Sequence, residues 1–483
     1  MAFTGAAQAV RLGCQIASVI VMSRLLEPSD FGILAMCAPV FAFAALFQDL
    51  GLTQATIQRP SVSHDEVNFL FWINVAVACA LGGVLVLLAP LVAVFYGEAR
   101  AAPLTAALAV PLVLYGLSSQ HYALLNRAMR FGVLATIEGV AVVVGLAVAI
   151  AWASTAPSVW ALYAGTLAAA LTTMTLFWST SRWLPTRPRH VEGARGLMRF
   201  GAGVTGFGLA NFVSRNADNV MIGRVWGDVA LGYYSRAYRL LLFPLQQINS
   251  PVAKVMLPVL SRLTGDADAY RRTFLRVMGL IAAVAVPGVV FMIATADTLV
   301  PLALGAKWGS VVPIFMALGV AGVFQPLNGT AHWLLVSQGR TDDYVRLGVG
   351  TAVMSVAAFA IGIRHGPVGV ATAYGVSEAL RTPLVWWYVG RSGPVGWRDA
   401  SATLLPVLLA AALAYLVTHA VAPRLPPRVV AEPVIGLALS LTCSYAVFAL
   451  VLLAFRPGRA ILLDLVRIPV RFLEGWRRPA HAR

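Results

Sequence analysis

Long apolar segments, separated by short polar stretches, follow one another along almost the whole chain. Most hold about 20 or more residues, which is enough for a helix to cross the ~30 Å hydrocarbon core of a bilayer. The pattern therefore predicts an all-α polytopic membrane protein with about 14 transmembrane helices. The predicted spans are 5–26, 31–56, 68–95, 102–125, 132–153, 157–181, 203–225, 231–258, 277–302, 311–337, 345–363, 367–389, 401–421 and 433–455.

Charged residues interrupt the apolar pattern most clearly between residues 211 and 254. A charge at the centre of a bilayer costs roughly 2.5–3.5 kcal/mol on insertion scales, so such residues should face a cavity or one another. At about 100° per residue, two polar stripes form on successive helices. The first stripe holds Asn211, Arg215, Asp218 and Ile222, and the second holds Arg236, Arg239, Gln246, Ser250 and Lys254. The first span carries a similar stripe of Gln8, Arg11, Gln15 and Ser18.

An internal repeat relates the two halves of the chain. SRLLEPSDFGIL at 23–34 aligns with GRVWGDVALGYY at 223–234, so that Arg24 matches Arg224 and Gly32 matches Gly232. Six spans separate the copies, and an even number preserves orientation, which predicts parallel repeats about an axis along the membrane normal. The predicted domains are an N-lobe (1–181), a basic cytoplasmic linker (182–200), a C-lobe (201–390), two further spans (391–455) and a basic amphipathic cytoplasmic tail (456–483).

Composition supports the membrane class and sets the orientation. Of the 483 residues 59% are hydrophobic and 12% are charged, whereas soluble domains are less apolar and about twice as charged. The net charge of +16 comes from Lys and Arg that gather in the even-numbered loops and the tail, which places both termini in the cytoplasm. This distribution explains the positive charge without nucleic acid as a partner.

Motifs for catalysis and metal binding are not expected. GAGVTG at 201–206 matches a dinucleotide fingerprint, but it opens a membrane span and lacks the strand that such a site needs. Asn328-Gly329-Thr330 fits a glycosylation sequon, but it lies within a predicted span. The four cysteines have no pair spacing, and no nucleophile, P-loop or HExxH arrangement is present. No cofactor is therefore expected.

The residues proposed for binding are Arg11, Gln15, Arg215, Arg236, Arg239 and Lys254. Arginine binds phosphate oxygens through paired N–H donors, so a cationic cavity suits a pyrophosphate. The structural alternative is pairing within helices, for example of Arg215 with Asp218 or of Glu378 with Arg381. A buried carboxylate could also carry a coupling H⁺ or Na⁺, and Asp218 and Asp49 are the candidates.

Several of these stretches resemble one protein family. They are SRLLEPSDFGILAM, FQDLGLTQATIQR, FWIN, FYGE, LPVLSRL and, most specifically, SRNADNVMIGRVWGDVALGYYSRAYRLLLFPLQ. Over roughly residues 10–390 the chain resembles the polysaccharide transporter branch of the MOP exporter superfamily, in particular Wzx-type oligosaccharide flippases of the colanic-acid exporter kind.

The resemblance implies two pseudo-symmetric six-helix lobes in a V plus two C-terminal helices, in a bacterial inner membrane. It implies a flippase, not an enzyme, that moves undecaprenyl-diphosphate-linked oligosaccharide between leaflets, with Arg11, Arg215, Arg236 and Arg239 as contacts. Membrane lipids, a polysaccharide polymerase and glycosyltransferases are further candidate partners. Three competing functions stay open: a lipid II-type flippase, a multidrug-and-toxin-type cation-coupled antiporter, and a membrane scaffold of polysaccharide synthesis that transports nothing.

Overall fold

Helices account for nearly all of the regular structure. The computed structural model describes residues 2–48, 51–59, 61–187, 194–421 and 432–477, and these ranges contain no strand. Contacts divide the chain into two units, Met1–Ser235 with Ala303–Gly305, and Arg236–Leu302 with Ala306–Arg483. This division falls within one long helix, and the predicted lobe boundary at 182–200 stays a prediction.

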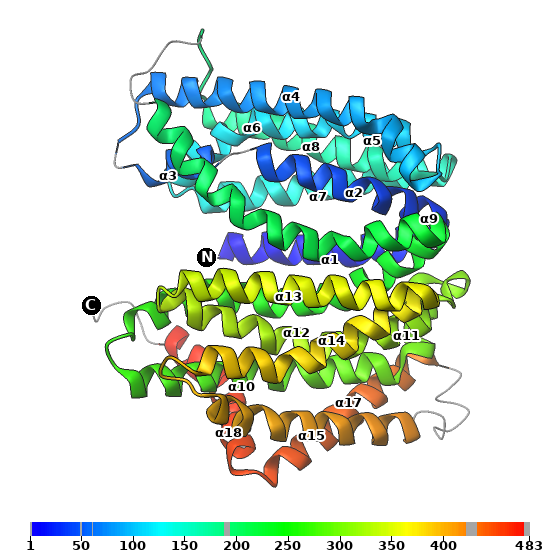
Figure 1. Ribbon diagram of the computed structural model, residues 1–483, viewed down its shortest axis with the longest axis vertical. Coiled ribbons are helices and arrows are strands. Elements are labelled where there is room, and N and C mark those ends of the chain that lie inside the picture. Colours follow the sequence, from blue (N-terminus) through cyan, green and yellow to red (C-terminus); the bar gives the residue numbers. More distant parts are fainter. Residues whose placement is uncertain (1, 49–50, 60, 188–193, 422–431, 478–483) are drawn as a thin grey trace. The chain divides into compact units, whose positions relative to one another are not determined.

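The first unit is a set of long helices packed along their shafts (Figure 1). α6 contacts both α4 and α8, and α7 packs against both α8 and α1. Its helices are α1 (Ala2–Leu25), α2 (Pro28–Gln48), α3 (Leu52–Gln58), α4 (His64–Tyr96), α5 (Ala101–Ala107), α6 (Ala109–Arg127), α7 (Phe131–Thr155), α8 (Val159–Ser181) and the first arm of α9 (Ala194–Arg262).

The sequence fixes several of these elements locally. Ser63 and Glu66 form a reciprocal capping box at the start of α4, and Gly97 ends that helix in the left-handed conformation. Between α7 and α8 the backbones approach closely, because a side-chain carbon at Gly145 would lie 2.7 Å from the carbonyl oxygen of Gly165. Small residues at such contacts are typical of helix packing in membranes.

The second unit holds a larger apolar core, in which α10 packs against α12 and α15, and α12 packs against α14. Phe274 and Trp386 are among its largest buried side chains, with ring centroids 6.0 Å apart. Its helices are the second arm of α9, α10 (Ala267–Ala294), α11 (Ala296–Leu304), η1 (Ala306–Trp308), α12 (Val311–Ser337), α13 (Thr341–Gly362), η2 (Ile363–His365), α14 (Gly366–Gly390), α15 (Trp397–Val421), α17 (Pro433–Leu453) and α18 (Arg456–Arg477).

Ten helical stretches of the described chain are long and apolar enough to cross a membrane, which confirms the polytopic all-α class. One of them, Thr341–Gly390, has 50 residues, about 75 Å of helix, and breaks at Gly366, so it suits two crossings. The helices with the polar stripes, α1 and α9, are not among the ten. The total of about 14 spans stays a prediction.

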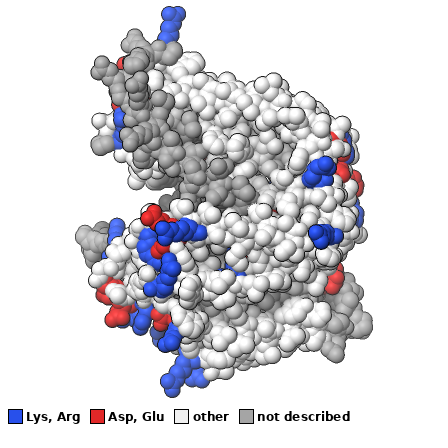
Figure 2. Space-filling view, viewed as in Figure 1, with Lys and Arg blue, Asp and Glu red and all other residues white. Residues whose placement is uncertain are grey.

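Charged side chains gather at the ends of the helices, and the shafts between them are almost free of charge on the visible face (Figure 2). This is the distribution that a hydrocarbon layer around the shafts would require. Helix α18 lies where the sequence predicts an amphipathic tail, and its position on a membrane surface stays a prediction.

Candidate functional site

The polar region of the sequence forms helix α9, which bends at Gly227. Gly227 has φ 80° and ψ −172°, a conformation open to glycine and strained for other residues. The break separates the arms 194–226 and 228–262, close to the two predicted spans 203–225 and 231–258. The first arm carries Arg215 and Asp218, and the second carries Arg236, Arg239 and Lys254.

Asp218 is buried against a tyrosine from beyond the break. The residue is only 4% exposed, and its carboxylate accepts a hydrogen bond from the Tyr234 hydroxyl at 2.9 Å. The backbone N–H of Asn219 donates a second bond at 2.8 Å. The alternative in which Asp218 neutralises Arg215 is wrong, because the described residues contain no ion pair between them and the carboxylate turns to Tyr234.

The cations of α9 differ in their surroundings. Arg236 is buried, at 6% exposed, and lies one turn from Arg239. Arg215, Arg239 and Lys254 have exposed side chains. Within the described part of the chain, Arg215 and Arg239 make no hydrogen bond and no ion pair with protein groups. Arg215 belongs to the first unit and the other three belong to the second, so a common cavity stays a prediction.

Helix α1 contributes the remaining candidates. Arg11 binds Glu138 of α7 at 3.0 Å, and both side chains are more than two-fifths exposed. Gln15 lies one turn further on and is half-buried. An anion that binds Arg11 would therefore compete with Glu138 in a solvated pair. Asp49, the second coupling candidate, lies outside the described residues.

The two copies of the repeat pack directly against each other. A side-chain carbon at Gly32 would lie 1.8 Å from the carbonyl oxygen of Asp228, and one at Gly232 would lie 1.9 Å from the carbonyl oxygen of Pro28. Pro28 and Asp228 are themselves equivalent in the repeat, so the two contacts are related by its symmetry. The alignment identifies both glycines, and the structure explains them: any side chain would force the backbones apart.

A charged group next to this crossing ties it to the loop between α4 and α5. Arg100 binds Glu98 through Nε at 2.9 Å and through Nη2 at 3.0 Å, and Nη2 also binds Asp228 at 2.9 Å. These hydrogen bonds lower the pKa of Glu98 below its ordinary value. The Arg224 guanidinium lies 5.8 Å from the Phe95 ring centroid. Arg100 is thus the ion-pair partner of Glu98, the last residue of the FYGE motif.

Helices α12 and α14 share a polar cluster within their spans. Glu378 is fully buried and pairs with Arg381, as the sequence predicts. Asn328 donates a hydrogen bond to Glu378 at 3.0 Å, and Arg381 donates one to Ser355 at 3.3 Å. In the sequence, Asn328 stands out only as part of a sequon within a span. The signal that could have identified Asn328 as a partner of Glu378 is that both are polar residues within predicted membrane spans.

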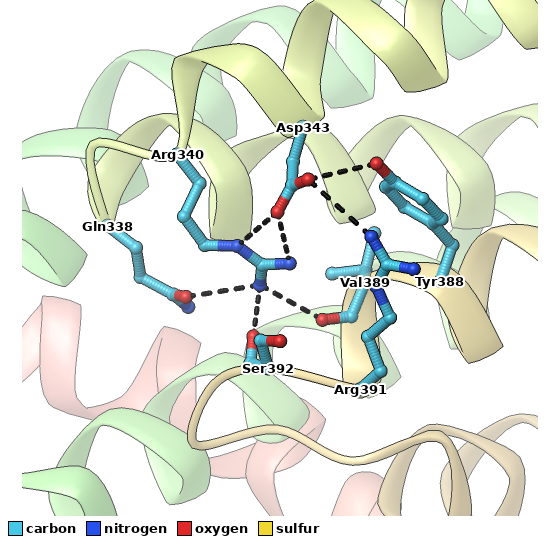
Figure 3. Close-up of polar contacts among 7 residues, drawn as sticks. All are labelled: Gln338, Arg340, Asp343, Tyr388, Val389, Arg391 and Ser392. Atoms are coloured by element: carbon cyan, nitrogen blue, oxygen red, sulfur yellow. Dashed lines mark hydrogen bonds and ion pairs between the residues drawn. The ribbon is translucent and has the colours of Figure 1, made fainter.

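The ends of α12, α13 and α14 meet around Arg340 (Figure 3). Its guanidinium binds Asp343 at 2.8 and 2.9 Å and the Val389 carbonyl at 3.0 Å, and it also contacts the Ser392 carbonyl. Asp343 in turn accepts from the Tyr388 hydroxyl at 2.9 Å and lies 3.7 Å from Arg391. We call these residues the Arg340 cluster.

Comparison with known proteins agrees with this architecture. WzxC, the lipopolysaccharide biosynthesis protein of Escherichia coli (strain K12), is 24% identical over 384 residues, 79% of this chain and 78% of that one. ExoT, the succinoglycan biosynthesis transport protein of Rhizobium meliloti (strain 1021), is 26% identical over 319 residues, 65% of this chain and 64% of that one.

Among solved structures, the lipid II flippase MurJ in its inward closed conformation matches with a TM-score of 0.73. The match covers 93% of this chain and 98% of that one at 13% identity, which establishes the shared fold. A family model described as polysaccharide biosynthesis protein matches residues 21–313, more than half of the sequence. The chain therefore belongs to this polysaccharide biosynthesis protein family of membrane proteins.

Proposed function

We propose that this chain is a flippase that moves an undecaprenyl-diphosphate-linked oligosaccharide across the membrane for the synthesis of exopolysaccharide, capsule or O-antigen. The family and the names of its relatives support polysaccharide export. The observation that carries the mechanism is a pair of exposed arginines, Arg215 and Arg239, without protein partners among the described residues. A diphosphate supplies the negative charge that they lack.

Each arginine can take two phosphate oxygens through parallel N–H donors, which fixes the orientation of the headgroup. Arg236 adds positive potential from a buried position, and Arg11 exchanges Glu138 for phosphate as the headgroup enters. Gln15 and Lys254 extend the polar path along α1 and α9. The lipid tail stays in the bilayer while alternating access carries the headgroup between leaflets.

The crossing at Gly32 and Gly232 fits the alternating-access step. It lies at the ends of spans that the charge distribution places on the outer side, where a flippase must close before it admits a substrate from inside. The backbone contact there leaves no room for a headgroup. Separation of the two glycines would be part of opening.

The buried Asp218 is the candidate for coupling to H⁺ or Na⁺. Its carboxylate has two hydrogen-bond donors and no cationic partner among the described residues, so it can accept a cation when the site opens. Asp49 is the second candidate. Imposed pH and Na⁺ gradients across vesicles, with Asp218→Asn as the variant, would identify the coupling ion.

The proposed location is the bacterial inner membrane with both termini in the cytoplasm, and the proposed role is transport, not catalysis. A polysaccharide polymerase and glycosyltransferases are the proposed protein partners. Membrane lipids surround the shafts that Figure 2 shows to be almost free of charge.

Reconstituted vesicles provide the test. Undecaprenyl-diphosphate oligosaccharide with a fluorescent label on the sugar is incorporated, and an impermeant quencher is added outside. Protein-containing vesicles should lose the inner-leaflet fluorescence that empty vesicles keep. A scaffold without transport would keep it, and that result would refute the proposal.

The same vesicles distinguish the proposed substrate from lipid II and from organic cations. Labelled lipid II moved in preference to the oligosaccharide would favour the lipid II-type function. Uptake of an organic cation in exchange for H⁺ or Na⁺ would favour the antiporter. Arg215 and Arg239 have no ion-pair partner among the described residues, which argues against the antiporter, because organic cations need an acidic cavity. The same two arginines suit a diphosphate on either lipid.

A further inference from the structure

A second basic site lies away from α9, in a hollow of about 590 Å³ in the second unit. It is formed where α10 and α15 meet α18. The hollow shares no residue with the polar stripes of α1 and α9. Its lining residues are Arg272, Thr273, Leu275, Arg276, Thr403, Pro457, Ala460, Ile461, Asp464 and Arg467.

The charge in this hollow is strongly unbalanced. Arg272 and Arg276 lie one turn apart on α10, so their side chains share a face of the helix, and Arg467 joins them from α18. Asp464 is the only acid among the lining residues, and it binds Arg276 at 2.5 Å. Arg272 and Arg467 make no hydrogen bond or ion pair with described protein groups. Two guanidinium groups are therefore available to an anion.

Apart from two threonines, the rest of the lining is apolar, and part of it is firmly packed. Ile461 is buried at 6% exposed, and its side chain approaches Gly279 of α10 so closely that a side-chain carbon there would lie 2.9 Å away. The core contact holds α18 against α10, and Leu275, Pro457 and Ala460 continue the apolar wall. A ligand with a phosphate joined to a hydrocarbon chain could bind both parts of this lining, because the arginines would meet its phosphate and the apolar wall would meet its hydrocarbon.

We propose that this hollow binds the headgroup phosphate of an anionic phospholipid. Arginine pairs with phosphate through parallel N–H donors, and basic pockets between membrane helices on the cytoplasmic side are typical sites for anionic headgroups. Both segments that supply the arginines, 261–276 and the tail, are predicted to be cytoplasmic. Free phosphate offers the same oxygens but cannot use the apolar wall.

The experiment measures lipid binding to the purified full chain in detergent by native mass spectrometry. Dioleoylphosphatidylglycerol, dioleoylphosphatidylcholine and inorganic phosphate are the probes. Near a membrane surface each Arg contributes about 1 kcal/mol, so Arg272→Ala and Arg467→Ala should each weaken phosphatidylglycerol binding about 5-fold. The double variant should weaken it more than either single variant, and binding of phosphatidylcholine should not change.

The matched control is Arg364→Ala, because Arg364 is also exposed, makes no described hydrogen bond or ion pair and lies outside the hollow. Arg467→Gln serves as a second variant if the double alanine variant melts early. Equal phosphatidylglycerol affinity in wild type and double variant would overturn the site. Binding of inorganic phosphate with the same arginine dependence, and none of phosphatidylglycerol, would overturn the lipid as its source. Neither result depends on transport of the oligosaccharide.

Discussion

Arg340 and two arginines of helix α9, Arg215 and Arg239, have opposite surroundings. Arg340 binds a carboxylate and two backbone carbonyls (Figure 3). Its side chain is only 15% exposed. Arg215 and Arg239 carry the same group on α9 and form no ion pair with an acid among the described residues. We therefore expect Arg340 to stabilise the fold, and the proposal that Arg215 and Arg239 bind a ligand predicts that these two arginines contribute to transport instead.

Removal of the unpaired cations should have the largest effect. In the Arg215→Ala, Arg239→Ala double variant, transport should fall by about 100-fold or more, because two ionic hydrogen-bonding groups to phosphate are lost at about 1.5–3 kcal/mol each. The melting temperature should stay close to the wild-type value, since neither side chain forms a hydrogen bond or ion pair with the described residues. The vesicle assay measures transport, and Arg364→Ala is the control. Wild-type transport at equal protein levels would show that these arginines do not bind substrate.

Removal of the paired anion should give the reverse result. Asp343→Ala takes the carboxylate from Arg340 and the acceptor from Tyr388, so the ends of α13 and α14 lose their connection. We expect a clear fall in melting temperature and unchanged transport per folded molecule. A double-mutant cycle with Arg340→Ala isolates the pair. If Asp343→Ala abolishes transport at normal stability, the cluster belongs to the transport path.

The sequence is a sufficient guide where a residue's partner is nearby or its position is repeated. It predicts the helical class, the break near residue 227 and the Glu378–Arg381 pair, whose members lie one turn apart. It also aligns Gly32 with Gly232, although periodicity alone gives no sign that their backbones touch. The alignment identifies the two positions, and the packing of the backbones explains why both must be glycine.

Partners on other helices cannot be predicted in this way. Helical spacing places Asp218 beside Arg215, but the bend at Gly227 returns the chain and brings Tyr234 to the carboxylate. Glu138 is an isolated acid in the sequence, and its pairing with Arg11 requires α1 and α7 to pack together. The spacing of residues along a helix predicts which side chains share a face. The packing of the chain determines which residues contact that face.

A second comparison lies within α9, where Asp218 accepts two hydrogen bonds from protein groups and the neighbouring Arg215 forms no hydrogen bond or ion pair with the described residues. Tyr234→Phe removes one donor from a buried carboxylate and should cost about 0.6–1 kcal/mol of stability. Thermal melting in detergent measures the loss, and Tyr163→Phe is a control with no described hydroxyl contact. Stability equal to wild type would mean that another group replaces the hydroxyl.

The smallest effect is expected at Glu98, whose partner Arg100 is more than half exposed to solvent. Hydrogen bonds from Arg100 hold the pKa of Glu98 below its ordinary value of about 4.3, so the folded state binds the proton more weakly than the unfolded state. The stabilisation is complete above about pH 4.3 and is lost as the pH falls through the lowered pKa. The melting temperatures of wild type and Glu98→Gln should therefore become more similar as the pH is lowered from about 6 to about 3. If the pair contributes nothing to stability, the difference in melting temperature will not depend on pH. The contacts from Glu98 through Arg100 to Asp228 would then not stabilise the glycine crossing. If the two melting temperatures do become more similar at low pH, the ion pairs of Arg100 stabilise the fold, as those of the Arg340 cluster are expected to do.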